Sequence, residues 1–281
     1  LSRDEAKVLG IILLDSYLIV DGVRIPETLL EPPRLYDAMA AGRPVSTAQT
    51  SVFGRCQSYE SALARYGRVL YLSVGSAYTG NFATANRWRE TCDPARGFAV
   101  MDTGAASGRL GLIARLVANA ARTADSLPQL SAFAELAVQR CGELLFLDQL
   151  KFLVAGGRLS RSKGFMGDLL GIKPVISPRS DGAVKIGSVR KTSEQLDFAL
   201  NYLKGRFTRA DRPTLLLQYS DNQARVADGI RPALEKHFPR ARIMITPLSL
   251  TAGTHMGPGT WGVAYCPDLA GALDSLRTDN E

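Results

Sequence analysis

Four short clusters of glycine, serine and threonine are the parts of this 281-residue sequence best suited to chemistry. Small hydroxyl groups and backbone N–H groups donate hydrogen bonds without carrying charge, so together they suit a carboxylate or a phosphate. Each cluster alone is more typical of an ordinary turn or helix cap, and the interpretation depends on their joint placement. The clusters are residues 46–51, 76–81, 102–107 and 254–260.

His255 is the side chain of the fourth cluster with the widest chemical range. It lies among glycines in a predicted loop, which is a poor place for a packed core residue. We therefore interpret it as a hydrogen-bond donor to a ligand carboxylate or as an acid–base group. The other histidine, His237, ends a basic helical pattern and is expected at the surface. Asp102 could orient His255 in a Ser-His-Asp hydrolase, but no GxSxG nucleophile elbow accompanies them.

The sequence argues against three other kinds of site: a dinucleotide site, a P-loop and a metal site. Residues 257–262 match GxGxxG, but a dinucleotide fingerprint follows a strand and opens a helix, whereas this one leads into a predicted strand. No Walker A sequence is present. The four cysteines have no metal-like spacing, and we expect reduced thiols, no metal and no cofactor. They are Cys56, Cys92, Cys141 and Cys266.

The first half of the chain alternates strand and helix patterns, which favours a parallel sheet covered on both faces. In such a sheet, ligands bind beyond the carboxyl ends of the strands, where the second and third clusters lie. Ser126 is a plausible N-cap for a further helix at 127–140. The predicted strands are 69–74 and 98–102, and the helices between and after them are 82–90 and 110–124.

The second half favours a mixed sheet with helices on one face. A strand at 144–147 opens it, and the remaining strands are 173–176, 183–186, 214–219, 242–247 and 260–265. Two long helices are predicted at 194–204 and 223–237. The fold class is therefore α/β in two domains, an N-terminal parallel α/β/α domain over residues 1–142 and a C-terminal α+β domain over 143–281.

Charge and hydropathy narrow the classes of partner. The net charge is +7, and residues 151–191 carry nine bases against two acids, which suits an acidic partner, a phosphate or simply a solvated basic face. Aromatic interleaving is poor, so we expect no nucleic acid partner. The apolar stretch 8–20 is interrupted by Asp15 and Ser16 and is too short to span a membrane. No secretory signal is visible, so we expect a cytoplasmic protein.

Six segments, in order, resemble motifs of the DegV family, over nearly the whole chain. Residues 47–51 (TAQTS) resemble its T-S-Q-P-S, and residues 78–82 (YTGNF) its L-S-G-T-Y. Asp102-Thr103 resembles the D-S that follows the next strand. The remaining three are 150–160 (LKFLVAGGRLS), 169–174 (LLGIKP) and 255–260 (HMGPGT).

This resemblance implies a function as well as a fold. Family members bind a long-chain fatty acid in a tunnel between two α/β domains, and some present its carboxylate to a bacterial fatty acid kinase. The kinase then forms acyl phosphate for phospholipid synthesis. The resemblance thus implies a lipid-binding subunit without catalytic residues of its own. Its expected partners are the fatty acid and the catalytic subunit of the kinase, with no membrane span but room for transient membrane contact.

The resemblance also assigns residues. It assigns the ligand to Thr47, Thr79, Gly80, Asn81, His255 and Gly257. It also implies that Arg158 and Arg190 help to dock the kinase or its phosphate. Ala48 and Asn81 replace a family serine and threonine, so the head-group donors differ. The family's first strand, with its own D-S motif, is expected before Leu1.

Burial of a lipid tail is energetically sufficient for such a site. A tail of about 16 carbons at roughly 0.8 kcal/mol per methylene gives on the order of 12 kcal/mol before association costs. The tail then supplies affinity and neutral donors supply orientation, leaving no buried charge unpaired in the empty site. The alternative is a small-molecule kinase or transferase related to dihydroxyacetone kinases, which share the fold. A nucleic-acid regulator using the basic stretch would show salt-dependent binding to DNA.

Overall fold

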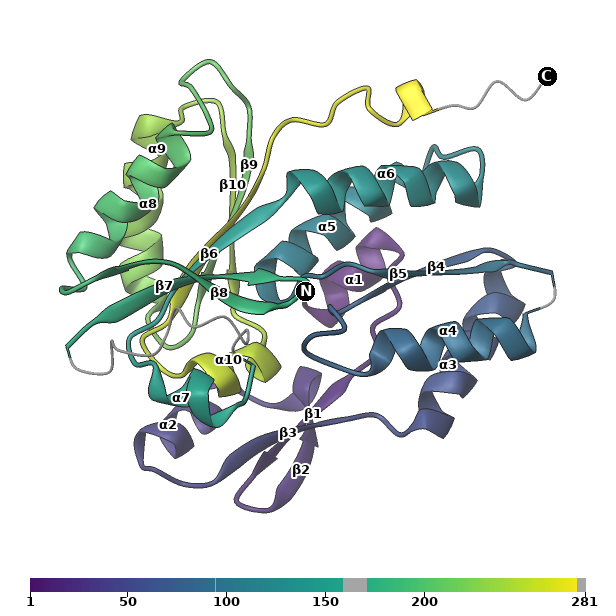
Figure 1. Ribbon diagram of the computed structural model, residues 1–281, viewed down its shortest axis with the longest axis horizontal. Coiled ribbons are helices and arrows are strands. Elements are labelled where there is room, and N and C mark those ends of the chain that lie inside the picture. The colour runs from purple at the N-terminus through teal and green to yellow at the C-terminus, as the bar shows by residue number, and fades with distance from the viewer. Residues whose placement is uncertain (94, 159–170, 277–281) are drawn as a thin grey trace.

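Two sheets and a smaller third one organise the chain in the computed structural model, which describes residues 1–93, 95–158 and 171–276 (Figure 1). The elements before residue 140 are α1 (Arg3–Leu9), β1 (Ser16–Val20), β2 (Val23–Pro26), α2 (Pro32–Ala40), β3 (Val45–Gln49), α3 (Val52–Tyr66), β4 (Val69–Ser73), α4 (Asn81–Cys92), β5 (Phe98–Asp102), α5 (Ser107–Ala120) and α6 (Leu127–Arg140).

The predicted parallel pair is present. β4 and β5 run parallel in register from Val69 opposite Phe98, with α4 as the crossover between them. One face packs against α3 and α4 through an aromatic cluster, in which the rings of Tyr59 and Trp88 lie 5.2 Å and 5.0 Å from that of Phe98. The other face packs against α5 and α6. Both faces are therefore covered, as the strand–helix alternation predicted.

A small antiparallel sheet, which the sequence did not predict, precedes this pair. Its strand order is β2-β1-β3, and Leu18 of β1 lies opposite Thr47 of β3. Leu18 and Val20 are fully buried against α2 and against Leu250 in the second half of the chain. This sheet thus connects the first polar cluster, which lies on β3, to the C-terminal half.

The larger sheet has six strands in the order β10-β9-β11-β6-β7-β8. Only β9 and β10 are parallel; the other neighbours are antiparallel, so the sheet is mixed as predicted. The elements after residue 140 are β6 (Gly142–Phe146), α7 (Lys151–Ala155), β7 (Lys173–Arg179), β8 (Gly182–Val189), α8 (Glu194–Lys204), β9 (Thr214–Tyr219), α9 (Arg231–His237), β10 (Arg242–Pro247), α10 (Leu250–Met256) and β11 (Trp261–Cys266).

Both faces of this mixed sheet are buried, which refines the expectation of helices on one face. Leu215 and Leu217 of β9 point toward α8 and α9, whereas Leu216 points toward α5 and α6. Figure 1 shows α5 and α6 lying between the six-stranded sheet and the β4–β5 pair. One helical layer therefore belongs to the cores of both halves of the molecule.

Several predicted boundaries are confirmed and others shift. α6 and α8 match residue for residue, and Ser126 caps α6 by accepting a hydrogen bond from Gln129 N at 3.2 Å. The helix predicted over 223–237 contains a π-helical segment, Arg225–Ile230, before α9. Pro232 explains the change, because it lacks an N–H and its ring displaces the carbonyl four residues earlier.

Two further findings concern the cysteines and the possibility of a membrane-spanning helix. All four cysteines lie in the described residues and none forms a disulfide. Among the helices of the described ranges, none is long and apolar enough to cross a bilayer.

Candidate functional site

Thr47 and His255 meet although 208 residues separate them in the chain. Thr47 Oγ1 and His255 Nε2 lie 3.3 Å apart and share a hydrogen bond in a half-buried position. Thr47 comes from the centre of β3, and His255 comes from the last turn of α10. The first and fourth polar clusters are therefore neighbours in space, as the resemblance implied.

His255 lies on a helix, so the prediction of a glycine-rich loop at this position was wrong. α10 has seven residues and is capped by Ser249, whose Oγ accepts a hydrogen bond from Ala252 N. Gly253 lies inside the helix because α10 packs closely on α2, where a Cβ would overlap the hydroxyl of Tyr36. The glycine therefore serves helix packing here, and the helix ends at Gly257 with φ of 85°.

Burial keeps the imidazole of His255 neutral. Desolvation, reinforced by the nearby guanidinium of Arg158, lowers the pKa of His255 from 6.5 to about 4. At neutral pH the ring can therefore donate one hydrogen bond and accept another, but it carries no charge. A carboxylate placed beside it would favour protonation and raise this pKa.

Two glycines allow α7 and α10 to pack closely around His255. A Cβ on Gly156, just after α7, would overlap Nδ1 of His255. A Cβ on Gly257 would overlap the ring of Phe152 on α7, and its positive φ adds a second requirement for glycine. Gly257, which was assigned to the ligand, thus lies beside His255 in a packing role.

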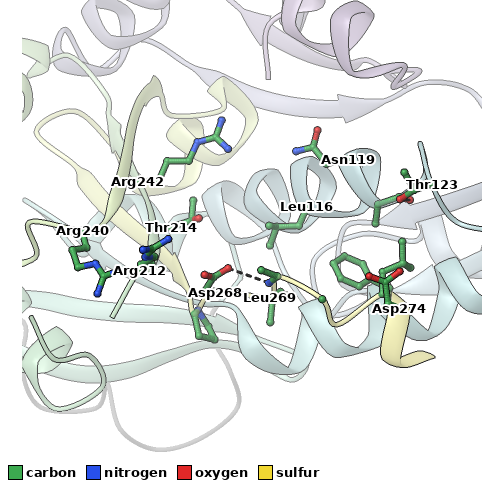
Figure 2. A pocket seen from close by; sticks show the side chains of 16 residues that line it. Leu116, Asn119, Thr123, Arg212, Thr214, Arg240, Arg242, Asp268, Leu269 and Asp274 are labelled. Carbon is green, nitrogen blue, oxygen red and sulfur yellow. Dashed lines mark hydrogen bonds between the residues drawn. The ribbon is translucent and has the colours of Figure 1, made fainter. Parts of the chain in front are cut away.

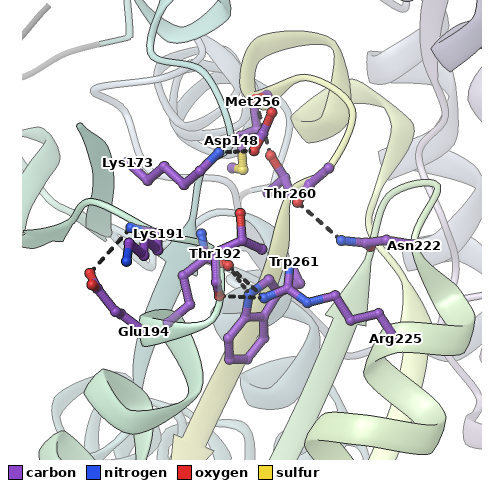
Figure 3. A network of polar contacts seen from close by, with 12 residues as sticks. Asp148, Lys173, Lys191, Thr192, Glu194, Asn222, Arg225, Met256, Thr260 and Trp261 are labelled. Atoms are coloured by element: carbon purple, nitrogen blue, oxygen red, sulfur yellow. Dashed lines mark hydrogen bonds and ion pairs between the residues drawn. The ribbon is translucent and has the colours of Figure 1, made fainter. Parts of the chain in front are cut away.

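The loop after α10 is fixed by hydrogen bonds to its neighbours. Gly259 N donates to Asp221 Oδ1 at 2.6 Å, and Asn222 Nδ2 donates to Gly259 O at 3.0 Å. Thr260 Oγ1 closes the loop on itself by donating to Met256 O at 3.1 Å. Figure 3 shows Asn222 and Thr260 in this network, beside the ion pair of Lys173 with Asp148. The loop is a rigid support for His255.

The second cluster, Thr79 to Asn81, forms the turn that opens α4. Thr79 is half-buried, and its Oγ1 accepts a hydrogen bond from Asn81 N at 3.3 Å. Gly80 is exposed at the N-cap position, with its carbonyl accepting from Thr84 Oγ1 at 3.1 Å. Backbone N–H groups at such a helix start are suited to an anion.

Arg55 links this turn to the strand that carries Thr47, and the sequence analysis missed it. Its Nη1 donates to Gln49 Oε1 at 2.7 Å and also to Asn81 Oδ1. Gln49 lies two residues after Thr47, so both point to the same face of β3. A signal was available, because Arg55 shares its helical face with Tyr59 and Ala62, which are buried.

The third cluster serves mainly to close loops. Asp102 accepts hydrogen bonds from Ser76 N at 3.1 Å and Gly104 N at 3.0 Å, which ties the loop after β4 to the loop after β5. Ser107 donates to Gln218 Oε1 at 2.9 Å. Asp102 is thus engaged with backbone groups of these loops, a role unlike that of an acid orienting His255 in a hydrolase.

The two assigned arginines lie in different surroundings. Arg158 is half-buried near His255, and its Nη1 donates to the carbonyl of Gly156. Arg190 is exposed after β8, and its backbone N–H donates to Glu194 Oε2 at 2.9 Å. Arg158 belongs to the DegV-like motif at 150–160, of which residues 159–160 lie outside the described residues. The first two residues of the motif at 169–174 also lie outside them.

A cavity of about 550 Å³ lies away from this site (Figure 2). Arg212, Arg240 and Arg242 line it near the starts of β9 and β10, together with the end of α5 and the segment after β11. His255 follows the opposite end of β10, so this cavity does not contain the predicted site. Within the described ranges, no group of three His, Cys, Asp or Glu side chains could hold a metal ion.

Comparison with known proteins identifies similar chains over nearly the whole length. A family model described as "Uncharacterised protein, DegV family" matches residues 1–268. A DegV domain-containing protein of Clostridium perfringens is 24% identical over 269 residues, covering 94% of this chain and 91% of the relative. One from Mycobacterium tuberculosis is 27% identical over 262 residues, covering 92% and 88%.

Solved structures share the fold. A fatty-acid-binding DegV family protein from Thermus thermophilus superposes with a TM-score of 0.86 at 23% identity, covering 95% of this chain and 96% of the other. A DegV fatty acid binding protein from Bacillus subtilis gives a TM-score of 0.85 at 19% identity, with 95% of each chain covered. The α/β fold class predicted from the sequence is confirmed.

Proposed function

The chain belongs to the DegV family, and on that premise we propose that it binds a long-chain fatty acid and presents the carboxylate to a fatty acid kinase. Relatives with this fold from Thermus thermophilus and Bacillus subtilis bind fatty acids. A stearic-acid-binding protein from Eubacterium ventriosum has the fold at a TM-score of 0.81. In this proposal the chain is a carrier, and the phosphoryl transfer is carried out by its partner.

The observation that carries the proposal is the hydrogen bond between Thr47 and His255. It brings a hydroxyl and a neutral imidazole from opposite halves of the chain into one half-buried position. A carboxylate entering between them accepts from both groups. Thr79, Gly80 and Asn81 contribute further donors at the start of α4, and Gly257 keeps α10 close to α7 in support of His255.

The tail, in this proposal, runs between the two domains, with a boundary at residues 142 and 143. β6 begins there and leads the chain into the six-stranded sheet. A site formed between domains can open for an insoluble ligand and close around it. The carboxyl end then lies at the Thr47–His255 pair, where the two halves touch.

Arg158 and Arg190 are proposed to face the kinase and its nucleotide phosphates. The charge of Arg158 acts on His255, whose pKa it helps to lower, so in this proposal it is at the carboxylate end of the site, where the phosphoryl group arrives. Arg190 is exposed and can meet a partner surface. Replacing either arginine by alanine is expected to reduce acyl phosphate formation more than retention of the fatty acid.

The first experiment is native mass spectrometry of the purified protein, followed by organic extraction of whatever it releases. A fatty acid at one equivalent supports the proposal and reports the chain length directly. The Thr47→Ala, His255→Ala double variant should retain much less lipid, whereas Thr208→Ala, far from the site, should retain the wild-type amount. An empty protein that also rejects added fatty acids would contradict the proposal and favour a small-molecule enzyme related to dihydroxyacetone kinases.

A further inference from the structure

Arg55 is a buried cation whose hydrogen-bond partners are all neutral. Its side chain is 7% exposed, and Nη1 donates to the amide oxygens of Gln49 and Asn81. Its Nε is buried and meets no acceptor. Within the described ranges, no carboxylate forms an ion pair with this guanidinium. Burying a charge in this way is unfavourable unless something compensates it. The expectation that the empty site leaves no buried charge unpaired was therefore wrong.

Arg115 shows what a compensated arginine looks like in the same molecule. It is also 7% exposed, but its Nε and Nη2 donate to the two carboxylate oxygens of Glu5 at 2.7 Å and 2.8 Å. This bidentate pair neutralises the charge inside the protein. Arg55 has the same degree of burial without an equivalent acid, so its charge remains available to a ligand.

Arg55 lies next to the residues proposed to bind the head group of the ligand. Gln49 follows Thr47 on one face of β3, and Asn81 follows Thr79 in the turn before α4. Because Arg55 donates to Gln49 and Asn81, its guanidinium lies between the two halves of the proposed head-group site. It is therefore bonded to a side chain two residues away from each of the two hydroxyl groups, Thr47 and Thr79, that would hold a carboxylate.

We infer that Arg55 is the counter-charge that makes this site select an ionised carboxylate over a neutral amphiphile of the same length. This inference rests on the proposed function and adds the basis of its specificity. Hydroxyl groups and a neutral imidazole also bind alcohols and amides, so they discriminate weakly between head groups. A buried positive charge favours the anion alone, and the charge stranded in the empty site is compensated when the carboxylate binds.

The test compares a C16 fatty acid with the C16 fatty alcohol at pH 7.5, using the full chain stripped of bound lipid. The wild-type protein should prefer the acid. In Arg55→Gln, affinity for the acid should fall about tenfold or more while affinity for the alcohol is unchanged, because only the charge-assisted contact is lost. Arg55→Lys keeps the charge and should keep most of the preference. Arg65→Gln, an exposed position on the same helix, is the matched control and should behave as wild type.

The outcomes separate this inference from the proposed function. If the wild-type protein binds both amphiphiles and Arg55→Gln keeps the wild-type preference, the inference is wrong while fatty acid binding stands. If the wild-type protein binds neither, the proposed function fails and the inference with it. The thermal midpoint of the lipid-free protein is a second readout. Arg55→Gln should leave it unchanged or higher, whereas Arg115→Gln, which strands Glu5, should lower it; an unfolded Arg55→Gln would mark a structural role and overturn the inference.

Discussion

Two buried titratable side chains have pKa shifts of opposite sign. The pKa of His255 is lowered to about 4 by burial and by Arg158, so its neutral form is stabilised. Glu143 on β6 is fully buried, and burial raises its pKa from 4.5 to about 7. Its Oε1 accepts hydrogen bonds from Gly108 N and Gln218 Nε2, while Oε2 has no partner. Protonation of His255 therefore destabilises the folded protein, whereas protonation of Glu143 stabilises it.

Replacing Glu143 by glutamine should stabilise the protein selectively at high pH. The folded-state pKa is above the unfolded value, so the contribution of the protonated form is fully present below pH 4.5 and is lost as pH rises through about 7. The unfolding free energy of Glu143→Gln minus that of the wild type should increase by on the order of 2–3 kcal/mol as the pH rises from 5 to 8. Urea unfolding of both proteins at the two pH values measures this. A difference that does not change with pH would contradict it.

His255 should reveal ligand binding through its own titration. Its folded pKa is below the ordinary value, so stability present above pH 6.5 is lost as pH falls through about 4. A bound carboxylate should raise the pKa of this imidazole, because a negative neighbour favours the protonated ring. NMR titration of the ring protons with and without fatty acid measures the change. His237, at the end of α9, serves as the internal control and should not respond.

At the scale of single elements, short helices fixed by glycine contacts position the site. α7 and α10 contact one another, and α10 also contacts α2, β1 and β3. Gly253 allows α10 to approach Tyr36, and Gly156 allows the end of α7 to approach His255. These two helices have five and seven residues, so packing rather than intrinsic propensity holds them in place.

Adding one methyl group at Gly156 should displace the imidazole and weaken ligand binding. The Cβ of Gly156→Ala would overlap Nδ1 of His255, and relief requires the ring or α7 to move. We expect a loss of at least several-fold in fatty acid affinity, with destabilisation of about 1–3 kcal/mol at most. Isothermal titration and thermal melts measure the two effects. Gly229→Ala is the control, because nothing lies within 4 Å of its Cβ, and it should bind lipid as wild type does.

The elements that the sequence predicted are those whose local pattern agrees with their packing. β9 and β10 match their predicted bounds because both are short apolar runs between turn signals. The β2-β1-β3 sheet was missed because its strands have only four or five residues and a mixed burial pattern. The helix that contains His255, α10, was missed because Gly253 is intrinsically unfavourable in a helix. The close contact of Gly253 with Tyr36 is not visible in the sequence.

The candidate site was predictable in part for the same reason. Thr47 and His255 were assigned from motifs, and the structure brings them together, while their roles stay a prediction. Arg55 was overlooked because a charged residue near a helix start is usually exposed. Its spacing from Tyr59 and Ala62 indicated a buried face, but its partners Gln49 and Asn81 are visible only in the structure.

For the whole molecule, the α5–α6 layer is the main structural link between the halves. Its apolar residues pack against β4 and β5 on one side and against β9 and β11 on the other. Arg109 reinforces the link, because its Nη2 donates to Val138 O on α6 at 2.7 Å and its Nη1 to Pro178 O on β7 at 3.2 Å. The two halves therefore share one hydrophobic cluster, in addition to their polar contact between Thr47 and His255.

We expect the two halves to unfold together because of this shared layer. Far-ultraviolet circular dichroism and tryptophan fluorescence, to which Trp88 of the first half and Trp261 of the second both contribute, should give one coincident thermal transition. Fatty acid in excess should move that single transition upward by several degrees, since a ligand at 100 times its dissociation constant adds about 2.7 kcal/mol. Two separate transitions, with only one of them responding to lipid, would show that the halves are independent.

The hydrogen bond between Thr47 and His255 has a kinetic consequence. It occupies the imidazole nitrogen that would bind the carboxylate, and it joins β3 in the first half of the chain to α10 in the second. A fatty acid therefore competes with an internal partner, and the bond has to break before the ligand is seated. The bond should therefore slow the entry of the fatty acid rather than its release, and it should re-form once the carboxylate has left.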